Sequence, residues 1–253
     1  MRDAWNERTW QPLGARDPYF AVCNEPQYRA GHLDAAARAA FFASGEAHVA
    51  WLDALVRGTV APDFAPRRAL DFGCGVGRLT LPLARRAAEV VGCDVSPAML
   101  AEAERNRVAA AASNVAFVRS DDALGEVDGS FDFVHSFIVF QHIPPPRGVA
   151  IATRLIERLR PGGVGALHFT YRRRAPAWRR GVHAMRRAVP GVNAVVNLAQ
   201  GRRAGEPLFP MFEYDLAELF GLLAARGCPG THAAFTDHGG HLGAMLVFRV
   251  PGA

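Results

Sequence analysis

The stretch LDFGCGVGRLT, residues 70–80, places an acidic residue and three glycines between an apolar run and a segment with helical character. Gly73, Gly75 and Gly77 permit a sharp turn and let a ligand approach the main chain without meeting a Cβ atom. Two large classes of cofactor-binding protein place such a turn between a strand and a helix. The fold must therefore accommodate a bare backbone at this point, and the remaining segments decide between the two classes.

Short apolar runs alternate with helical patterns from residue 69 onward, which is typical of βαβ units in a parallel sheet. A last helical segment at 214–227 is followed by two strand-like segments around the turn DHGGH. The sequence therefore predicts an α/β fold with a seven-stranded, mostly parallel sheet and an antiparallel final hairpin. The expected strands cover residues 69–72, 89–94, 115–120, 131–137, 163–169, 231–236 and 243–250.

Two segments are expected to lie outside this alternation. Residues 1–62 carry helical patterns that end near Pro62 and Pro66, so we expect an N-terminal helical cap followed by an α/β domain over 63–253. The segment 171–213 interrupts the alternation after the fifth strand and is expected to form an inserted helical lid. It holds nine arginines and two glutamates, which gives a net charge of +7 in a chain whose total is +5.

The composition gives a broad expectation about source and compartment. The N-terminus is polar, and no apolar stretch approaches the roughly 18 residues that a membrane span needs. The four cysteines are scattered without metal-ligand spacing, which favours reduced thiols in a cytoplasmic protein without a bound metal. Abundant alanine, with arginine and no lysine as the basic residue, indicates a GC-rich bacterial source.

The glycine loop departs from the dinucleotide-binding pattern G-x-G-x-x-G/A, whose third small residue lets the helix pack on the strand. Counting from Gly73 or Gly75 puts Arg78 or Thr80 at that place, which disfavours a nicotinamide-dependent oxidoreductase. The pattern acid-x-Gly-x-Gly-x-Gly from Asp71 instead resembles the first motif of class I S-adenosylmethionine-dependent methyltransferases. This resemblance implies a Rossmann-like fold, S-adenosyl-L-methionine as cofactor and S-adenosylhomocysteine as product.

Four further stretches, in the same order as in that family, extend the resemblance over residues 69–170. VVGCDVSPAML resembles the second motif, which implies that Asp94 binds the ribose diol and that Met99 packs near the adenine. VAFVRSDDA resembles the turn that recognises adenine. Two adjacent acids compete for the role in that turn, and Asp122 followed by Ala123 fits slightly better than Asp121. FDFVHSFIVFQHIP and LRPGGVGALHF resemble the segments that follow.

The same resemblance implies that the glycines leave room for the methionine part of the cofactor and that Asp71 holds its amino group. The cofactor residues expected in this way are Asp71, Gly73, Cys74, Gly75, Gly77, Asp94, Val95, Met99, Asp121, Asp122, Ala123, Ser136 and Phe137. Simpler interpretations stay open, because Asp71 could satisfy local backbone donors, Asp94 could cap the next helix, and the glycines could serve packing alone. That helix is expected to begin with Ser96 as its cap and Pro97 in its first position.

The acceptor side is specified less well. Methyl transfer from a sulfonium is an in-line displacement, and an oxygen acceptor also needs a base that removes its proton. Histidines near the carboxyl ends of the strands are candidates, and Asp237 beside His238 can form an orienting acid and base pair. The expected catalytic residues are His142, His238, Asp237 and His241. The alternatives are a plain glycine hairpin with solvated polar residues, a metal site at D-H-x-x-H, and a core position for His168.

The inserted segment contains the stretch APAWRRGVHAMRRAVPG, which is amphipathic when it is placed on a helix. Its apolar side carries Trp178, Val182, Met185 and Val189, and its basic side carries Arg179, Arg180, Arg186 and Arg187. The arginines could form a solvated face, attract an acidic or phosphorylated acceptor, or bring residues 175–190 to an anionic membrane surface with a lipid-linked acceptor. A nucleic-acid partner is not expected, because no aromatic-interleaved basic strand accompanies the segment.

The sequence thus predicts methyl transfer to a small-molecule, glycan or natural-product acceptor, with oxygen favoured over nitrogen. A catalytically inactive, S-adenosylmethionine-binding regulatory protein is the alternative, because no strong motif fixes the base on the acceptor side. The identity of the acceptor and the oligomeric state are left open.

Overall fold

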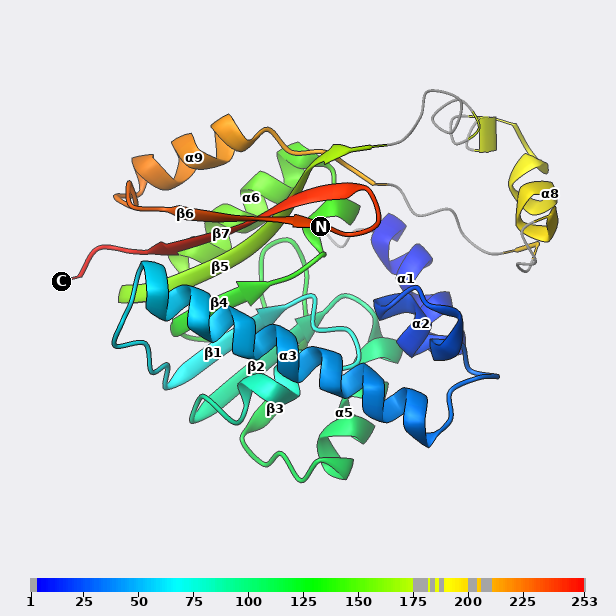
Figure 1. Ribbon diagram of the computed structural model, residues 1–253, viewed down its shortest axis with the longest axis horizontal. Helices are drawn as coiled ribbons and strands as arrows, with labels where there is room; N and C mark the ends of the chain where they lie inside the picture. Colours follow the sequence, from blue (N-terminus) through cyan, green and yellow to red (C-terminus); the bar gives the residue numbers. More distant parts are fainter. Residues whose placement is uncertain are drawn as a thin grey trace.

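The architecture is described from a computed structural model that covers residues 4–174, 182, 185–186, 189–199, 204–205 and 211–252, with residues 4–9 as backbone only. A twisted seven-stranded sheet runs through the molecule, and helices cover both of its faces (Figure 1). Its strands are β1 Arg68–Phe72, β2 Glu89–Asp94, β3 Val115–Arg119, β4 Phe131–Ser136, β5 Leu159–Arg173, β6 His232–Asp237 and β7 His241–Arg249.

The strand order is β3-β2-β1-β4-β5-β7-β6. The first five strands in this order are mutually parallel, whereas β7 is antiparallel to both of its neighbours. The expected α/β fold, with a Rossmann-like, mostly parallel sheet and an antiparallel final hairpin, is therefore confirmed. Because β6 runs in the same direction as β5, the turn between β6 and β7 lies at the edge where the parallel strands end.

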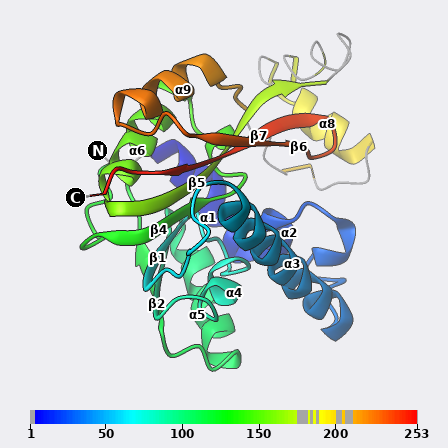
Figure 2. The same cartoon turned by 60° about the vertical axis from the view of Figure 1, so that its left-hand side comes forward.

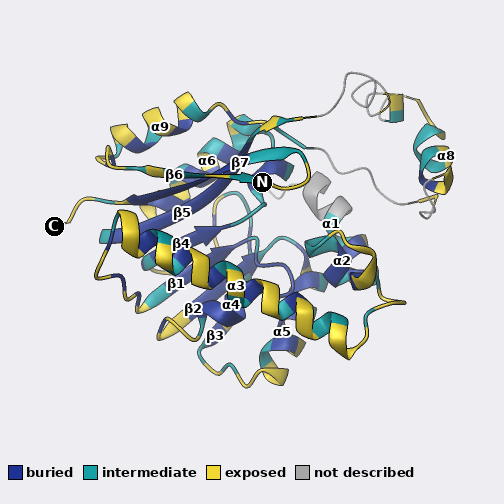
Figure 3. Cartoon of the chain, in the orientation of Figure 1, coloured by how far each residue is buried: buried dark blue, intermediate teal, exposed yellow. Residues whose placement is uncertain are grey.

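The central strands are buried on both faces, as parallel strands between helices must be (Figure 3). On one face, α6 Pro145–Glu157 and α9 Leu216–Ala225 place Leu155 and Leu223 in one apolar cluster with side chains of the sheet such as Leu167 of β5. On the other face, α3 Ala35–Thr59 crosses the sheet (Figures 1 and 2). Successive side chains of each strand point to opposite faces of the sheet and therefore belong to two separate apolar layers.

The N-terminal segment folds as α1 Ala4–Arg16, α2 Pro18–Val22, the 3₁₀ helix η1 Pro26–Tyr28 and α3. Within the helical patterns of residues 1–62, α3 forms one continuous helix, whose Val49, Leu52 and Val56 are buried against the sheet. Residues from the expected cap therefore belong to a core layer of the α/β domain. The boundary at residues 62 and 63 stays a prediction.

Local signals set the ends of the helix that follows β2. The Ser96 hydroxyl accepts a hydrogen bond from the Met99 backbone N–H, and Pro97 is the first residue of α5 Pro97–Ala109. Both features match the sequence-based expectation. The helix expected after the glycine loop is shorter, since α4 covers only Thr80–Leu83. Pro82 has no N–H with which to continue a helical bond pattern there.

The inserted segment is described only in part. Strand β5 extends to Arg173, beyond the expected start of the insertion at residue 171, because its backbone still pairs with β7 there. Helix α8 Val192–Ala199 lies farther along the chain. Trp178, Arg179, Arg180 and Arg187 lie outside the described residues, so the expected lid helix stays a prediction.

The described part of the insertion does carry exposed apolar side chains, with Met185 55% and Val189 48% accessible. Arg186 donates hydrogen bonds to the side-chain oxygens of Asn193 and Asn197 in α8. The Arg186 side chain is therefore bonded within the insertion.

The four cysteines, Cys23, Cys74, Cys93 and Cys228, are unpaired, as the sequence leads us to expect. None of the helices in the described part of the chain has the length and apolar character that crossing a membrane requires.

Candidate functional site

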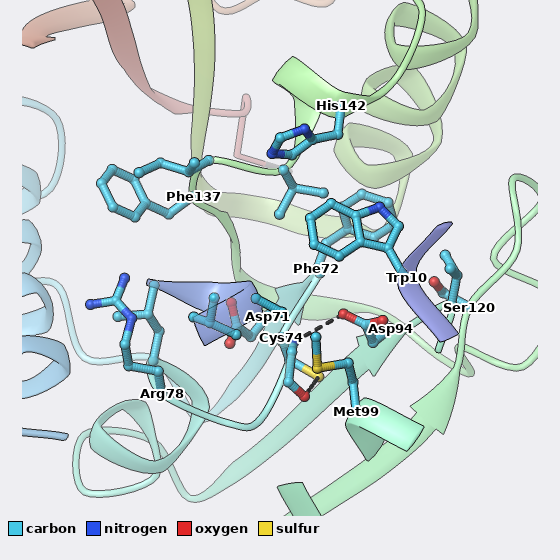
Figure 4. A pocket seen from close by; sticks show the side chains of 18 of the residues that line it. Trp10, Asp71, Phe72, Cys74, Arg78, Asp94, Met99, Ser120, Phe137 and His142 are labelled. Atoms are coloured by element: carbon cyan, nitrogen blue, oxygen red, sulfur yellow. Dashed lines mark hydrogen bonds between the residues drawn. The ribbon is translucent and has the colours of Figure 1, made fainter. Parts of the chain in front are cut away.

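A pocket opens at the carboxyl edge of the parallel strands, where open α/β sheets bind ligands. Its wall is formed by the loop after β1, the end of β2, the segment after β4 and the N-terminal helices (Figure 4). Asp94 and Met99 lie toward one end, whereas Arg78 and Phe137 lie toward the other. Of the expected cofactor residues, those that line it are Asp71, Gly73, Cys74, Gly75, Asp94, Val95, Met99 and Phe137.

The glycine loop adopts a backbone that side chains rarely tolerate. The φ angles of Gly73, Gly75 and Gly77 are +74°, +53° and +84°. A Cβ on Gly73 would lie 2.3 Å from Val139 Cγ2, and one on Gly75 would lie 2.8 Å from Val22 Cγ2. Gly73 and Gly75 line the pocket, whereas a Cβ on Gly77 would meet the Phe117 ring of β3. All three positions thus need glycine for their positive φ angles. Gly77 in addition leaves room for the Phe117 ring to pack against the loop.

Asp94, the last residue of β2, binds the backbone of the glycine loop. Its Oδ2 accepts the Gly75 backbone N–H at 3.0 Å, and its Oδ1 accepts the Ser96 N–H at 2.9 Å. Burial raises the pKa of this carboxyl, and these backbone donors act in the opposite direction. A carboxylate has about four acceptor positions, so Asp94 can accept two further donors from the pocket.

Asp71 is buried, and both of its carboxylate oxygens have local partners. Oδ2 accepts the Thr80 hydroxyl at 2.6 Å, and Oδ1 lies 3.0 Å from Nδ1 of His135. The interpretation that Asp71 satisfies local donors is therefore realised, with side chains as the donors instead of the backbone. Its role toward an amino group of the cofactor stays a prediction.

His135, which is bonded to Asp71, also contacts a further histidine, His48, that the sequence analysis does not identify. Nε2 of His135 lies 3.4 Å from Nε2 of His48, which belongs to α3. The two Nε2 atoms share one hydrogen bond, and its donor is set by the tautomers of the two rings. Burial lowers the pKa of His48 to about 2, and the charges of His135 and Arg78 add to the effect.

Phe137 separates the pocket from a group of histidines. Its ring centroid lies 4.0 Å from that of His48, 5.0 Å from that of His168 and 5.3 Å from that of His238. His168 is buried, as the core interpretation expects, and its Nε2 lies 2.8 Å from the Thr236 hydroxyl. Its Nδ1 has no hydrogen-bond partner among the described residues. Burial lowers the pKa of His168 to about 3, so this ring is neutral at physiological pH.

Among the expected catalytic residues, His142 is the one that lines the pocket. Its ring meets Trp10 of α1 edge to face at 5.1 Å, and its Nε2 lies 3.1 Å from the side-chain nitrogen of Gln141. The Thr170 hydroxyl donates to the Gln141 amide oxygen at 2.9 Å, which fixes the orientation of that amide. Gln141 therefore donates to His142 Nε2 and favours the neutral ring.

The turn between β6 and β7 lies at the expected edge of the sheet. Oδ1 of Asp237 accepts the Gly240 backbone N–H at 2.7 Å and so stabilises the turn. His238 and His241 pair through their backbones, and His238 reaches the outer side of Phe137. One oxygen of the Asp237 carboxylate serves the turn, while its charge acts to raise the pKa of His238 against the effect of burial, so the role of Asp237 as an orienting acid stays a prediction.

The adenine-recognising turn also differs from the expectation. Arg147 of α6 donates two hydrogen bonds to the Asp122 carboxylate, and Asp121 accepts the Gly125 backbone N–H. These two acids and Ala123 do not line the pocket, whereas Ser120 does. The preferred acid is therefore directed toward α6 by an arginine.

Two further departures concern residues around the loop. The Ser136 hydroxyl donates to the Phe72 carbonyl at 3.0 Å, so Ser136 ties β4 to β1 instead of lining the pocket. Trp10 lines the pocket because α1 is anchored beside it, where the Gln11 side-chain oxygen accepts the Ser96 hydroxyl and the Ala98 N–H, each at 3.0 Å. The helical pattern of the N-terminus gives no signal for this docking.

Comparison with known sequences places the central segment in a family. A family described as "Methyltransferase domain" matches residues 69–163. A trans-aconitate 2-methyltransferase of Methylobacterium radiotolerans is 35% identical over 158 residues, 60% of this chain and 56% of that protein. A ubiquinone biosynthesis O-methyltransferase of Ruegeria pomeroyi is 38% identical over 110 residues, 42% of each chain. The chain thus spans about half the length of such relatives.

Solved structures agree on the fold. Magnesium protoporphyrin IX methyltransferase from Synechocystis PCC 6803, with S-adenosylhomocysteine bound, superimposes with a TM-score of 0.60 over 95% of this chain and 98% of that one, at 19% identity. The N-methyltransferase NodS from Bradyrhizobium japonicum gives a TM-score of 0.59 over 97% and 98%, at 13% identity. The resemblance to class I methyltransferases is therefore confirmed for the fold and for the matched domain.

The buried neutral histidines make a prediction about stability. Unfolded histidine has a pKa of about 6.5, so below that pH the unfolded state binds a proton that His168 refuses until about pH 3. Stability contributed by neutral His168 is therefore present above pH 6.5 and is lost as the pH falls. Between pH 7 and 5, one such histidine costs about 2 kcal/mol of the free energy of unfolding.

Urea denaturation at pH 7 and pH 5 measures this loss. His168→Gln, which does not titrate in this range and can still bond Thr236, is expected to lose about 2 kcal/mol less than the wild type. His232→Gln, a change at an exposed histidine of β6, is the matched control and is expected to lose as much as the wild type. Equal losses for all three proteins would show that His168 is protonated in the folded state at pH 5.

Proposed function

Residues 69–163 of this chain belong to the methyltransferase domain family, and from that premise we propose that the protein transfers a methyl group from S-adenosyl-L-methionine to an oxygen atom of a small-molecule acceptor. The observation that carries this proposal is the convergence of the glycine loop and Asp94 on one pocket at the carboxyl edge of the sheet. S-adenosyl-L-methionine supplies an electrophilic methyl group on its sulfonium.

The residues present fit such a cofactor. The spare acceptor positions of the Asp94 carboxylate suit the two hydroxyl groups of a ribose, and a hydrogen bond to a charged group contributes about 1.5–3 kcal/mol. Met99 and Trp10 border the same end of the pocket and provide apolar surface for an adenine ring (Figure 4). Gly73 and Gly75 line the pocket with bare backbone, against which Val139 and Val22 lie closely.

On the acceptor side, the chain's task is to align the acceptor and to remove its proton. We assign the base to His142, because among the expected catalytic residues it is the one that lines the pocket; to take a proton at Nε2, its lone pair must exchange the Gln141 N–H for the acceptor's proton. His238 is the weaker candidate, because the Phe137 ring lies between it and the pocket. His241 and Asp237 lie in the turn and do not line the pocket.

The class of acceptor follows from charge. The insertion at 171–213 carries a net charge of +7, which attracts anions over about a Debye length of 8–10 Å. Two relatives are named for trans-aconitate, which is a carboxylic acid. We therefore favour an acidic small molecule over a neutral glycan or a lipid-linked acceptor at a membrane.

The cofactor assignment predicts that Asp94→Ala weakens binding of S-adenosylhomocysteine by about ten- to a hundredfold, because a charged hydrogen-bond acceptor is removed. Isothermal titration calorimetry measures this affinity. Asp122→Ala is the matched control: it removes an equivalent carboxylate just outside the pocket, and the affinity is expected to stay within about twofold. A large loss with Asp122→Ala and none with Asp94→Ala would reverse the assignment.

The base assignment predicts that His142→Gln, which keeps the size of the side chain, lowers kcat by at least about a hundredfold while S-adenosylhomocysteine affinity changes little. His238→Gln is expected to lower kcat by less than about threefold. The rate of S-adenosylhomocysteine formation is measured with trans-aconitate and with a set of carboxylic acids and phenols. Binding of the cofactor without turnover on any of them would favour the non-catalytic alternative.

A further inference from the structure

One cation in the pocket wall, Arg78, has no counter-ion among the described residues. Arg78 follows the glycine loop, and its Nη1 donates to the Ser44 hydroxyl at 3.2 Å. Its Nε is buried and has no hydrogen-bond partner among the described residues. Within that part of the chain no carboxylate lies within ion-pair distance of its guanidinium.

Other arginines of the chain form ion pairs with carboxylates. Arg68 pairs with Glu89, Arg147 pairs with Asp122, and Arg107 pairs with Glu104. Leaving a buried donor of a charged group unpaired is costly, because water is removed from it and nothing replaces it. A pocket that keeps such a donor is arranged for a ligand that brings the acceptor.

The position of Arg78 is fixed by its surroundings. Helix α3 approaches so closely at Gly45 that a Cβ there would lie 2.2 Å from the Arg78 carbonyl oxygen. The same helix supplies Ser44, which holds one nitrogen of the guanidinium. Arg78 and Phe137 lie at the same end of the pocket, away from Asp94 (Figure 4).

The neighbouring groups leave this positive charge unbalanced. His48 is neutral because burial, His135 and Arg78 all lower its pKa. The nearest acid of the pocket, Asp71, is already bonded to Thr80 and His135 through both oxygens. The Arg78 guanidinium has no carboxylate partner among the described residues, and the parallel N–H donors of a planar guanidinium have the spacing that a carboxylate accepts.

We propose that Arg78 is the anchor for a carboxylate group at this end of the pocket, bound through its guanidinium. The inference rests on the proposed function, since it assumes that the pocket receives the methyl donor and its acceptor. Two carboxylates can reach the anchor: the one on the methionine part of the cofactor, and one on an acidic acceptor. Their shared chemistry defines the site, and their sources are separable by experiment.

The test compares the wild type with Arg78→Met, which keeps the length of the side chain and removes the charge and donors. Arg85→Met is the matched control, because Arg85 lies seven positions along the chain and pairs with Glu46 away from the pocket. Three probes are titrated by calorimetry: S-adenosylhomocysteine, 5′-methylthioadenosine, which has no amino-acid part, and trans-aconitate in the presence of S-adenosylhomocysteine.

If the cofactor supplies the carboxylate, Arg78→Met weakens S-adenosylhomocysteine binding by about ten- to a hundredfold and leaves 5′-methylthioadenosine unchanged. If the acceptor supplies it, both nucleosides bind as in the wild type and trans-aconitate binding falls by the same factor. Arg78→Lys, which keeps the charge without the two-donor edge, is expected to recover only part of either loss. It also replaces Arg78→Met should that variant fail to fold.

The proposal is overturned if wild type and both Arg78 variants bind S-adenosylhomocysteine equally and trans-aconitate shows no preference for the wild type. It is also overturned if 5′-methylthioadenosine loses as much affinity as S-adenosylhomocysteine, since the arginine would then act on the nucleoside. Failure of the proposed function has a different signature, because the wild type itself would then not bind S-adenosylhomocysteine.

Discussion

The site depends on the attachment of the glycine loop to the end of β2. The backbone N–H groups of Gly73 and Cys74 both donate to the Cys93 carbonyl, and the N–H of Gly75 donates to the Asp94 carboxylate. Three successive donors are thereby satisfied by a neighbouring strand instead of by a helix, which allows the loop to turn with positive φ angles. Asp94 performs this structural task with part of its acceptor capacity and presents the rest to the pocket.

A second set of bonds joins this loop to the N-terminal helices. The Asp71 carboxylate accepts the Thr80 hydroxyl, which lies beyond the glycine loop, and contacts Nδ1 of His135 in β4. His135 in turn contacts His48 of α3 through its Nε2. Helix α3 lies against residue 78 through Gly45, which places Ser44 on the Arg78 guanidinium. The N-terminal segment therefore does more than cover the pocket, since it determines the position of groups on the pocket wall.

How far the sequence predicts this arrangement depends on how local each signal is. The glycine turn, the helix start at Ser96 and the position of Asp94 follow from neighbouring residues, and the structure has them as expected. The strand pattern also predicts the sheet, because burial between two helical layers leaves continuous apolar runs. Contacts between distant segments leave no such pattern. His48 lies 87 residues before His135, and the ion pair that turns Asp122 toward α6 needs Arg147, 25 residues later.

The same reasoning explains why the acceptor side is harder to specify than the cofactor side. The expected cofactor residues come from successive strand ends at one edge of the sheet, whereas Phe137 is surrounded by histidines from α3, from β5 and from the final hairpin. Each of those histidines is recognisable in the sequence only as a single residue. Their rings are neutral where they are buried, so the positive charge at this end of the pocket resides on Arg78. A neutral wall with one fixed cation favours an acceptor, or a part of the cofactor, that carries a single localised negative charge.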